Sequence, residues 1–372
     1  MSRTLVAIDA RLTQSTQTGD RAYWDGLLAG LRELSDPSLD LSLYFNAEPP
    51  AEIRSGPWKI HVLPAKSARW WSLVQFPLAA RRAGARVVHT QYTLSPLVRR
   101  GGVSTIHDVS FFVGPEWFRA RDRILLQLSI PATVRRAARI LTVSETSRRE
   151  IEHFIPAARG KVRVGSNGLP TWFRVVPRES AQTQVAERLG LSGPYALTVG
   201  TRWPRKNMNL AIDAVAGLPA GSSLRLAITG KPGWGDERSD ARTVATGYVD
   251  DDLMGALYAA AEVYLAPSRH EGFGIPLLEA WAADCPVICS SGGALPEVAG
   301  DAAVVMPGWE SADWSAALAG LLADPAKMEA MRAAGRTRRN QFQWIDAARV
   351  AAQAYHDAAQ VAAQDAAGEV GA

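Results

Sequence analysis

VYLAPSRHEGFGIPLLEAWAADCPVICSS, residues 263–291, sets the pattern for the whole chain. Its first six residues favour a buried strand, Gly272 and Gly274 lie in the turn that follows, and Pro276 fits the first turn of a helix. A second apolar run at 286–291 predicts another buried strand. Strand, helix and strand in this order are typical of a βαβ unit in a parallel sheet.

The same alternation of short apolar runs and helical patterns continues in both directions. We expect further strands at residues 4–10, 41–46, 59–64, 85–91, 103–109, 138–144, 195–200, 224–230, 245–249 and 302–307. Helices are expected at 23–34, 144–154, from Asn209, at 251–261, 276–284 and 344–367. The pattern predicts an α/β protein with two doubly wound, Rossmann-like parallel-sheet domains facing across a cleft.

The length of the chain also favours two domains. A chain of 372 residues, 47% of them apolar, is too long for one ordinary core. The irregular, Gly- and Pro-punctuated stretch at 165–192 is the expected linker. We therefore predict domains at 1–170 and 171–345, followed by a helix at 346–366 that packs back on the first domain.

Composition excludes several classes of protein. The net charge of +4 favours anionic ligands only mildly and does not indicate nucleic acid. Cys285 and Cys289 are the only cysteines and lie in the apolar run CPVICSS, residues 285–291, which indicates a buried strand, so we expect no disulfide framework and a reducing compartment. The start of the chain lacks the pattern of a signal peptide, and no apolar run approaches the ~20 residues that span a bilayer. We expect a cytoplasmic protein.

The glycine turn of the opening stretch is suited to an anion. Gly272 and Gly274 let backbone approach a ligand closely, and the unpaired N–H groups of the following helix attract phosphate. On one continuous helix Glu271 and Glu279 would be rotated by about 80° from each other, but the turn removes that restriction. One carboxylate could hold a transferred sugar and the other a ribose. A solvated Glu279 on an ordinary helix is the structural alternative.

A second loop of suitable chemistry is TVGTRWPRKN, residues 198–207. Here a predicted strand runs into a glycine and then into Arg202, Arg205 and Lys206. Cations at the mouth of a parallel sheet suit phosphate, because arginine offers a fork of donors and lysine a point charge. Both loops end neighbouring α/β units, so we expect them to converge. An exposed, solvated loop is the alternative.

These motifs, in this order, resemble the family 4 retaining glycosyltransferases of GT-B fold. The resemblance rests on STIHDVSFF, ARILTVSETSRREI, KVRVGSNGLP, VGTRWPRKNMNLAIDAV, LAITGKPGWGDE and the long run from TGYVDDD to VVMP. It covers most of the chain from Ile8 to the final helix. The two glutamates in their glycine context are its most specific element.

The resemblance implies a phosphate-binding role for both loops. Lys206, with Arg205 or Arg202, would neutralise the diphosphate of a nucleotide. The backbone of Gly272, Phe273, Gly274 and Ile275 would donate hydrogen bonds to the phosphates and to the donor sugar.

The remaining expected roles also follow from the resemblance. Glu279 would bind ribose hydroxyls and Glu271 the donor sugar. His107, with Asp108 beside it, would lie near the reactive face of that sugar. Gly19 would let backbone approach the donor phosphates or the acceptor, although an acidic residue follows it where the family often has a second glycine.

The expected reaction moves a hexosyl group from a nucleoside-diphosphate sugar to an acceptor hydroxyl with retained configuration, in polysaccharide or glycoconjugate biosynthesis. The forms GKPGWGDE and RKN look similar to mannosyltransferases that use GDP-mannose, and no further cofactor is expected. The acidic residues 250–252 could suggest a metal, but they directly precede the helical run LMGALYAAA, residues 253–261, where an N-cap and the dipole account for them. No metal is expected.

The acceptor would be a glycan or a lipid-linked molecule. Arginines interleave with aromatics at Arg69, Trp70, Trp71, Phe76, Arg81 and Arg82, which suits either peripheral contact with the inner membrane face or core packing. Three other functions are possible: a non-catalytic sugar-nucleotide binder on the same fold, a two-carboxylate hydrolase, and a nucleotide-sugar epimerase. The first βα turn lacks the G-x-G-x-x-G of the epimerase's cofactor site.

Overall fold

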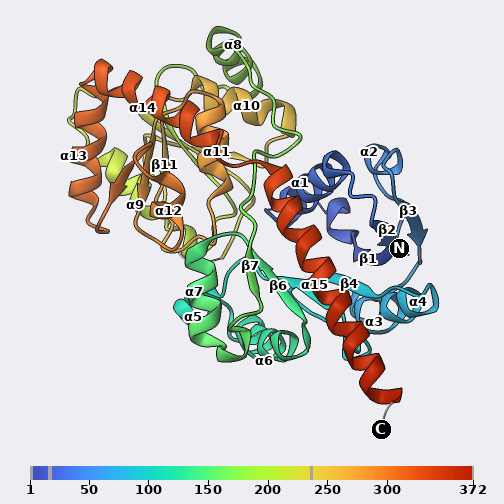
Figure 1. Ribbon diagram of the computed structural model, residues 1–372. Helices are drawn as coiled ribbons and strands as arrows, with labels where there is room; N and C mark the ends of the chain where they lie inside the picture. The colour runs from blue at the N-terminus through green and yellow to red at the C-terminus, as the bar shows by residue number, and fades with distance from the viewer. Residues whose placement is uncertain (1–2, 16–18, 235–237, 371–372) are drawn as a thin grey trace. The chain divides into compact units, whose positions relative to one another are not determined.

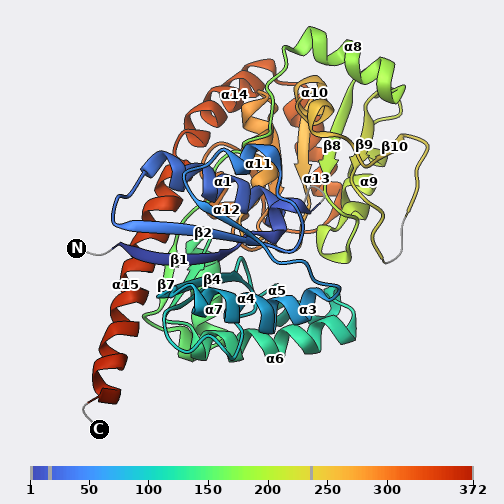
Figure 2. The ribbon, with the colours of Figure 1, turned by 90° about the vertical axis from the view of Figure 1, so that its right-hand side faces the viewer.

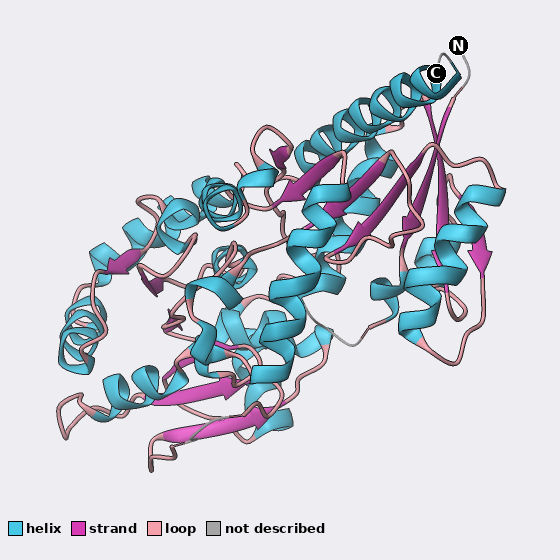
Figure 3. Cartoon of the chain, turned by 90° about the horizontal axis from the view of Figure 1, so that it is seen from below, coloured by secondary structure: helices cyan, strands magenta, loops and turns pink. Residues whose placement is uncertain are grey.

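The computed structural model describes residues 3–15, 19–234 and 238–370 (Figure 1). It divides into two compact units, one of residues 1–167 with 343–372 and one of residues 168–342. The chain therefore leaves the first unit once, completes the second, and returns to the first for its last helix. Each unit is built on a parallel sheet with helices around it (Figure 3).

The sheet of the first unit has seven strands in the order β3-β2-β1-β4-β5-β6-β7, all parallel. The strands are β1 (Thr4–Asp9), β2 (Leu39–Phe45), β3 (Lys59–Val62), β4 (Val87–Gln91), β5 (Gly102–Thr105), β6 (Arg139–Thr142) and β7 (Val162–Val164). The chain reverses its direction of strand addition between β1 and β4. Ligands of doubly wound sheets bind at the carboxyl ends of such a pair.

Helices cover both faces of this sheet. They are η1 (Arg11–Gln14), α1 (Gly19–Leu34), α2 (Ala51–Arg54), α3 (Ala68–Trp70), η2 (Trp71–Gln75), α4 (Phe76–Arg82), α5 (Ser110–Val113), η3 (Pro115–Trp117), α6 (Ala120–Arg136), α7 (Glu145–Phe154), η4 (Pro156–Ala158) and α15 (Trp344–Val370). The last helix, α15, runs beside α1 (Figure 1). The two helices approach closely because Gly26 and Gly30 lack side chains, and a Cβ at either would overlap Trp344. The other face is packed by a core that includes Phe76, Ile130 and Val134.

The sheet of the second unit repeats this arrangement with six parallel strands in the order β10-β9-β8-β11-β12-β13. They are β8 (Tyr195–Val199), β9 (Arg225–Thr229), β10 (Thr243–Gly247), β11 (Val263–Ala266), β12 (Val287–Ser290) and β13 (Val304–Met306). The reversal lies between β8 and β11. These are the strands that precede the cationic loop and the glycine turn.

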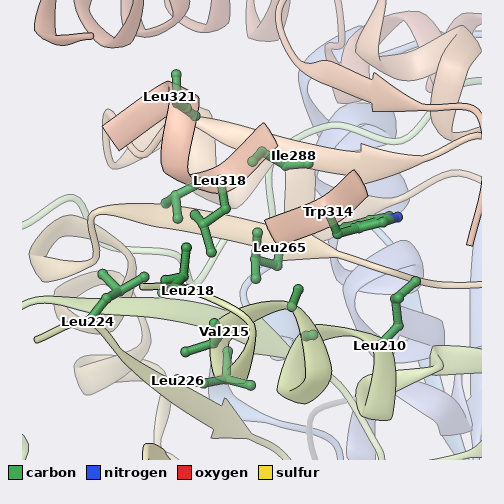
Figure 4. Packing of buried hydrophobic residues seen from close by; sticks show 14 of the residues in the cluster. Leu210, Val215, Leu218, Leu224, Leu226, Leu265, Ile288, Trp314, Leu318 and Leu321 are labelled. Carbon is green, nitrogen blue, oxygen red and sulfur yellow. The ribbon is translucent and has the colours of Figure 1, made fainter. Parts of the chain in front are cut away.

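The helices of the second unit hold these strand ends in place. They are α8 (Arg178–Leu189), η5 (Pro204–Lys206), α9 (Met208–Ala216), α10 (Asp251–Ala260), α11 (Ile275–Ala282), α12 (Leu295–Ala299), α13 (Ser311–Leu322) and α14 (Pro325–Arg339). Leu210 and Val215 of α9 and Trp314 and Leu318 of α13 pack with Leu265 of β11 in one buried cluster (Figure 4). Close packing of this kind fixes the geometry of the loops that the strands carry.

The predicted α/β class with two Rossmann-like sheets is confirmed. Both cysteines are buried and neither is in a disulfide. Within the described residues, no helix combines the length and the apolar character needed to cross a bilayer. Several details differ from the sequence analysis. Helices α6, α13 and α14 and strand β7 were not predicted, and α8 lies inside the stretch predicted as an irregular linker. Asp250 stands at the N-cap of α10 without a capping hydrogen bond from its side chain.

Candidate active site

The cationic loop after β8 and the glycine turn after β11 meet at the strand reversal of the second unit. Lys206 Nζ donates a hydrogen bond to Oε1 of Glu271 over 2.6 Å, and Arg205 Nη1 lies 3.2 Å from Oε2 of the same carboxylate. Both partners are charged, so these are among the stronger hydrogen bonds in proteins. The two loops therefore form one charged cluster at the carboxyl ends of β8 and β11.

Further hydrogen bonds lock this cluster in place. Arg205 Nη1 donates to the carbonyl oxygen of His270 at 2.6 Å, and the backbone N–H of Arg269 donates to the carbonyl oxygen of Arg205 at 2.7 Å. Ser268 Oγ donates to Glu271 Oε1 at 2.5 Å. Each loop thus orders the other, and contacts within the protein hold the cations in position.

Glu271 is ionised in this setting. Burial raises the pKa of its carboxyl, but the charges of Lys206 and Arg205 outweigh burial and lower the pKa to about 2. Two positive charges against one negative charge leave one net positive charge. That excess suits an anionic group.

Two glycines shape the glycine turn, one within it and one in the loop after β12. Gly274 has φ of +105° and directly precedes α11, so its conformation sets the direction of the helix N-terminus. Gly293, in the loop after β12, has φ of +63°, and a Cβ there would overlap the backbone of Glu271. The N–H of Ala294 donates to the carbonyl oxygen of Glu271 at 2.8 Å. A third loop therefore supports the turn.

Glu279 lies in α11 and is buried, which rules out the solvated alternative. Tyr258 donates its hydroxyl hydrogen to Oε2 of Glu279 at 2.8 Å. Burial raises the pKa of Glu279 to about 7, with Tyr258 and Lys206 opposing the rise. Near neutral pH this carboxyl can therefore exchange a proton, unlike Glu271.

The structure distinguishes the two arginines that the sequence left unranked. Arg205 joins Lys206 on Glu271, whereas Arg202 lines a pocket of about 590 Å³ with Trp203. Other residues of that pocket wall are Pro204, Asn207, Met208, Ile212, Ile228 and Arg238. The wall also includes Arg269, which bonds to Arg205 through its backbone, but neither glutamate belongs to it.

The backbone segment 272–275 leads into helix α11, as its expected contact with phosphate requires. Gly272 and Gly274 are buried, and Ile275 is the first residue of the helix. Phe273 packs edge-on against Phe342 with ring centroids 5.4 Å apart. That side chain anchors the turn, which leaves its backbone as the part suited to a ligand.

In the first unit, His107 follows β5 and belongs to a polar cluster that sequence reasoning only partly found. Gln91 Nε2 lies 2.8 Å from His107 Nε2 and donates to Asp20 Oδ1 at 2.6 Å, and Tyr92 donates to the same carboxylate oxygen at 3.3 Å. Gln91 is the last residue of β4 and Tyr92 follows it, so their position beside the strand reversal was the available signal. Burial lowers the pKa of His107, while Asp20 and Asp108 oppose this effect.

The other first-unit candidates are placed as follows. Asp108 accepts hydrogen bonds from the backbone N–H and the hydroxyl of Ser110, at 2.9 and 2.6 Å, at the start of α5. Gly19 is the first residue of α1, and a Cβ there would meet nothing within 4 Å. The preceding residues 16–18 and part of the GKPGWGDE motif, residues 235–237, lie outside the described residues.

Paired Rossmann-like units with phosphate-suited loops define the GT-B class, and solved structures of that class match. Sucrose-phosphate synthase from Thermosynechococcus elongatus aligns with a TM-score of 0.71 at 20% identity, over 95% of this chain and 98% of that chain. Alr3699/HepE from Anabaena, solved with UDP and glucose, aligns with a TM-score of 0.68 at 16% identity, over 94% and 98%.

Sequence relatives identify the family. The model for Glycosyltransferase Family 4 matches residues 36–173, and the model for Glycosyl transferases group 1 matches residues 193–324. Together the two models match both units, and the chain belongs to the family 4, group 1 glycosyltransferases.

Two groups of mannosyltransferases are among its relatives. It is 35% identical over 259 residues to O-antigen chain mannosyltransferase B of Escherichia coli, which is 65% of this chain and 66% of that protein. It is 26% identical over 240 residues to the serotype-specific mannosyltransferase WbdA of Escherichia coli, which is 60% of this chain and 29% of that protein. The chain thus spans less than two thirds of the length of these relatives.

Proposed function

We propose that this protein transfers a hexosyl group from a nucleoside-diphosphate sugar to an acceptor hydroxyl, with retained anomeric configuration and without a metal ion. The observation that carries the proposal is the convergence of Arg205 and Lys206 on Glu271 beside the N-terminus of α11. A glycosyl donor of this kind leaves as a diphosphate, so its departure depends on groups that stabilise negative charge.

The cluster supplies such groups in fixed positions. The guanidinium of Arg205 offers paired donors, the ammonium of Lys206 a point charge, and the start of α11 the positive end of a helix dipole. Donors held in place before the reaction stabilise developing charge without reorganising. These cations take the role that a divalent metal has in other nucleotide-sugar enzymes, which is why we propose a reaction without metal. No further cofactor is part of the proposal.

The bonding of Glu271 supports attack by the acceptor on the same face as the leaving diphosphate. Both of its carboxylate oxygens accept hydrogen bonds, Oε1 from Lys206 and Ser268 and Oε2 from Arg205. An oxygen held this way is a poor nucleophile for a covalent intermediate. We assign Glu271 to the donor sugar hydroxyls instead, and Glu279 to the ribose.

We propose GDP-mannose as the donor and a glycan or lipid-linked acceptor bound by the first unit near His107. The names of two relatives, O-antigen chain mannosyltransferase B and WbdA, support mannose and a role in polysaccharide biosynthesis. A structural neighbour, Alr3699/HepE, was solved with UDP-glucose, so that donor is the main competitor. The cysteine usage fits a reducing compartment, and we propose a cytoplasmic location.

The test is a donor panel with glycan acceptors in the presence of EDTA. We expect nucleoside diphosphate release from GDP-mannose and a retained anomeric configuration in the NMR spectrum of the product. Lys206→Ala should lower the activity about 10²- to 10³-fold, and Lys327→Ala, which alters an exposed lysine of α14, should leave it unchanged. Nucleotide-sugar binding without product from any donor would overturn the proposal in favour of a silent binder.

A further inference from the structure

Helix α6 of the first unit exposes an apolar surface to solvent. It lies along the lower edge of this unit in Figure 2. Its inner side is conventional, since Ile130, Thr133 and Val134 are buried. On the outer side, by contrast, 52% of Ile124, 48% of Leu125 and 69% of Leu128 are exposed. Neighbouring large aliphatics at such exposures mark a binding surface more often than single apolar residues do.

The exposed residues of α6 form one stripe with a regular charge pattern. At 100° per residue, positions 121, 124, 125, 128, 135 and 136 fall within a sector of about 120°. We call these six residues the α6 outer face: Arg121, Ile124, Leu125, Leu128, Arg135 and Arg136. Its three aliphatics lie between cations, with Arg121 and Arg136 about 22 Å apart along the helix axis.

Hydrogen bonds connect this helix to the loop between β4 and β5, and that loop to η2. The N–H of Leu94 donates to Thr133 Oγ1 of α6 at 3.0 Å, and Ser95 Oγ donates to the carbonyl oxygen of Leu73 in η2 at 2.6 Å. The loop between β4 and β5 thus links α6 to the Trp- and Arg-rich segment. That loop exposes its own aliphatic and basic side chains, Leu97, Arg99 and Arg100.

The Trp- and Arg-rich segment itself only partly fits the membrane hypothesis of the sequence analysis. Trp71 and Phe76 are fully buried and stack on each other in the core, so they cannot enter a bilayer. Trp70, at 59% exposure, remains on the surface. The stronger membrane candidate is therefore α6.

We propose that the α6 outer face docks on an anionic lipid bilayer. Its aliphatics would enter the boundary between headgroups and acyl chains, and its arginines would contact lipid phosphates. The only acidic residue exposed on α6 is Asp122, about 100° around the helix from Arg121. The surface, and hence the proposal, is independent of the donor and of the reaction.

Charge disfavours a second copy of the chain as the occupant. In a two-fold dimer through this face, the same patch meets itself, so the three arginines of one copy would lie against those of the other. Like charges that are brought together in an interface repel. An anionic bilayer offers the opposite sign over the whole face.

The experiment is vesicle flotation of the full chain at low and at high salt. We expect flotation with vesicles of phosphatidylcholine and phosphatidylglycerol, none with phosphatidylcholine alone, and release at 0.5 M salt, where charges are screened. The double variant Ile124→Gln/Leu128→Gln and the triple variant Arg121→Gln/Arg135→Gln/Arg136→Gln should each bind at least tenfold more weakly. Val175→Gln, at an exposed valine of the second unit, is the matched control.

Two results would overturn the proposal. One is flotation of the two α6 variants equal to that of the unaltered chain. The other is a dimer in solution that these variants dissociate, which would make the face an interface between copies. Glycosyl transfer to a water-soluble acceptor should stay unchanged in both variants, so a failure of membrane docking is distinguishable from a failure of the proposed function.

Discussion

Lys206 and Glu271 join two loops that are 65 positions apart in the sequence through one hydrogen bond of 2.6 Å. The side chain of Lys206 is 15% exposed and that of Glu271 is 13% exposed, so a ligand can reach both. The strands that carry them, β8 and β11, are neighbours in the sheet. A diphosphate that binds here, as we propose, would meet a cation that the protein has already fixed.

This geometry predicts that Lys206 and Arg205 matter more to activity than Arg202 does. We expect Lys206→Ala or Arg205→Ala to lower kcat about 10²- to 10³-fold, the range for losing one preorganised donor to a developing negative charge. Arg202→Ala removes a cation from the pocket wall and should cost much less. Steady-state kinetics of the three variants make the comparison, and an Arg202→Ala loss equal to that of Arg205→Ala would contradict it.

Glu271 should stabilise the fold above acidic pH. Its pKa of about 2 lies below the ordinary carboxyl value, so its contribution is present above about pH 4.5 and disappears as the pH falls towards 2. A shift of this size corresponds to about 3 kcal/mol at pH 7. We expect Glu271→Gln to lower the free energy of unfolding by that order, because two partly buried cations lose their partner.

A diphosphate should compensate for this loss. If the cations of the Glu271→Gln variant bind phosphate, GDP or UDP should raise its melting temperature more than it raises that of the unaltered chain. Thermal denaturation with each nucleotide measures the difference. An equal or smaller shift in the variant would mean that the ligand does not contact these cations.

Glu279 should have the opposite effect on stability. Its pKa is raised to about 7 by burial, so the folded state holds a proton that the unfolded state has already lost. Stability should therefore fall as the pH rises from about 4.5 to about 7, by about 3 kcal/mol in all. Glu279→Gln should flatten this slope in urea titrations at pH 5, 6, 7 and 8. A slope that persists in Glu279→Gln must come from another group.

Two kinds of feature could be predicted from the sequence: strands that recur as apolar runs along the chain, and polar residues that directly follow a strand. Alternating apolar runs defined both sheets, and Arg205, Lys206 and Glu271 stood out because each follows a strand end. Contacts that depend on packing were out of reach. Nothing in the sequence indicates that Tyr258 of α10 reaches Glu279, or that Gln91 lies between Asp20 and His107.

Helix α6 escaped prediction for a physical reason. A sequence pattern identifies a surface helix by apolar residues on the side that packs inward. Here Ile124, Leu125 and Leu128 lie on the outer side and Pro131 lies inside the helix, so the period is blurred. A helix whose apolar residues face solvent is easy to miss, and the same feature suggests a partner.

Asp20 should hold the pKa of His107 higher than burial alone would. The Asp20 carboxylate lies 3.6 Å from Nε2 of His107 and opposes the lowering of its pKa. Asp20→Asn should therefore lower the pKa of His107 further, because a negative charge that favours the protonated ring is removed. NMR titration of the ring protons measures this shift. Asp40→Asn, an acid paired with Lys59 instead, should leave His107 unchanged.

Alanine substitutions at Gly293 and Gly190 should distinguish two causes of lost stability: a strained backbone conformation and steric overlap at the site. Both have φ of +63°, but a Cβ at Gly190 would meet nothing within 4 Å, whereas one at Gly293 would overlap the backbone of Glu271. Gly190→Ala should cost about 1 to 2 kcal/mol of stability, the strain of a left-handed alanine. Gly293→Ala should cost more and should also lower kcat, because the loop must move Glu271 away from Lys206. Urea unfolding and steady-state kinetics of the two variants decide this. Equal losses of stability, with activity intact in both, would show that the loop after β12 does not position Glu271.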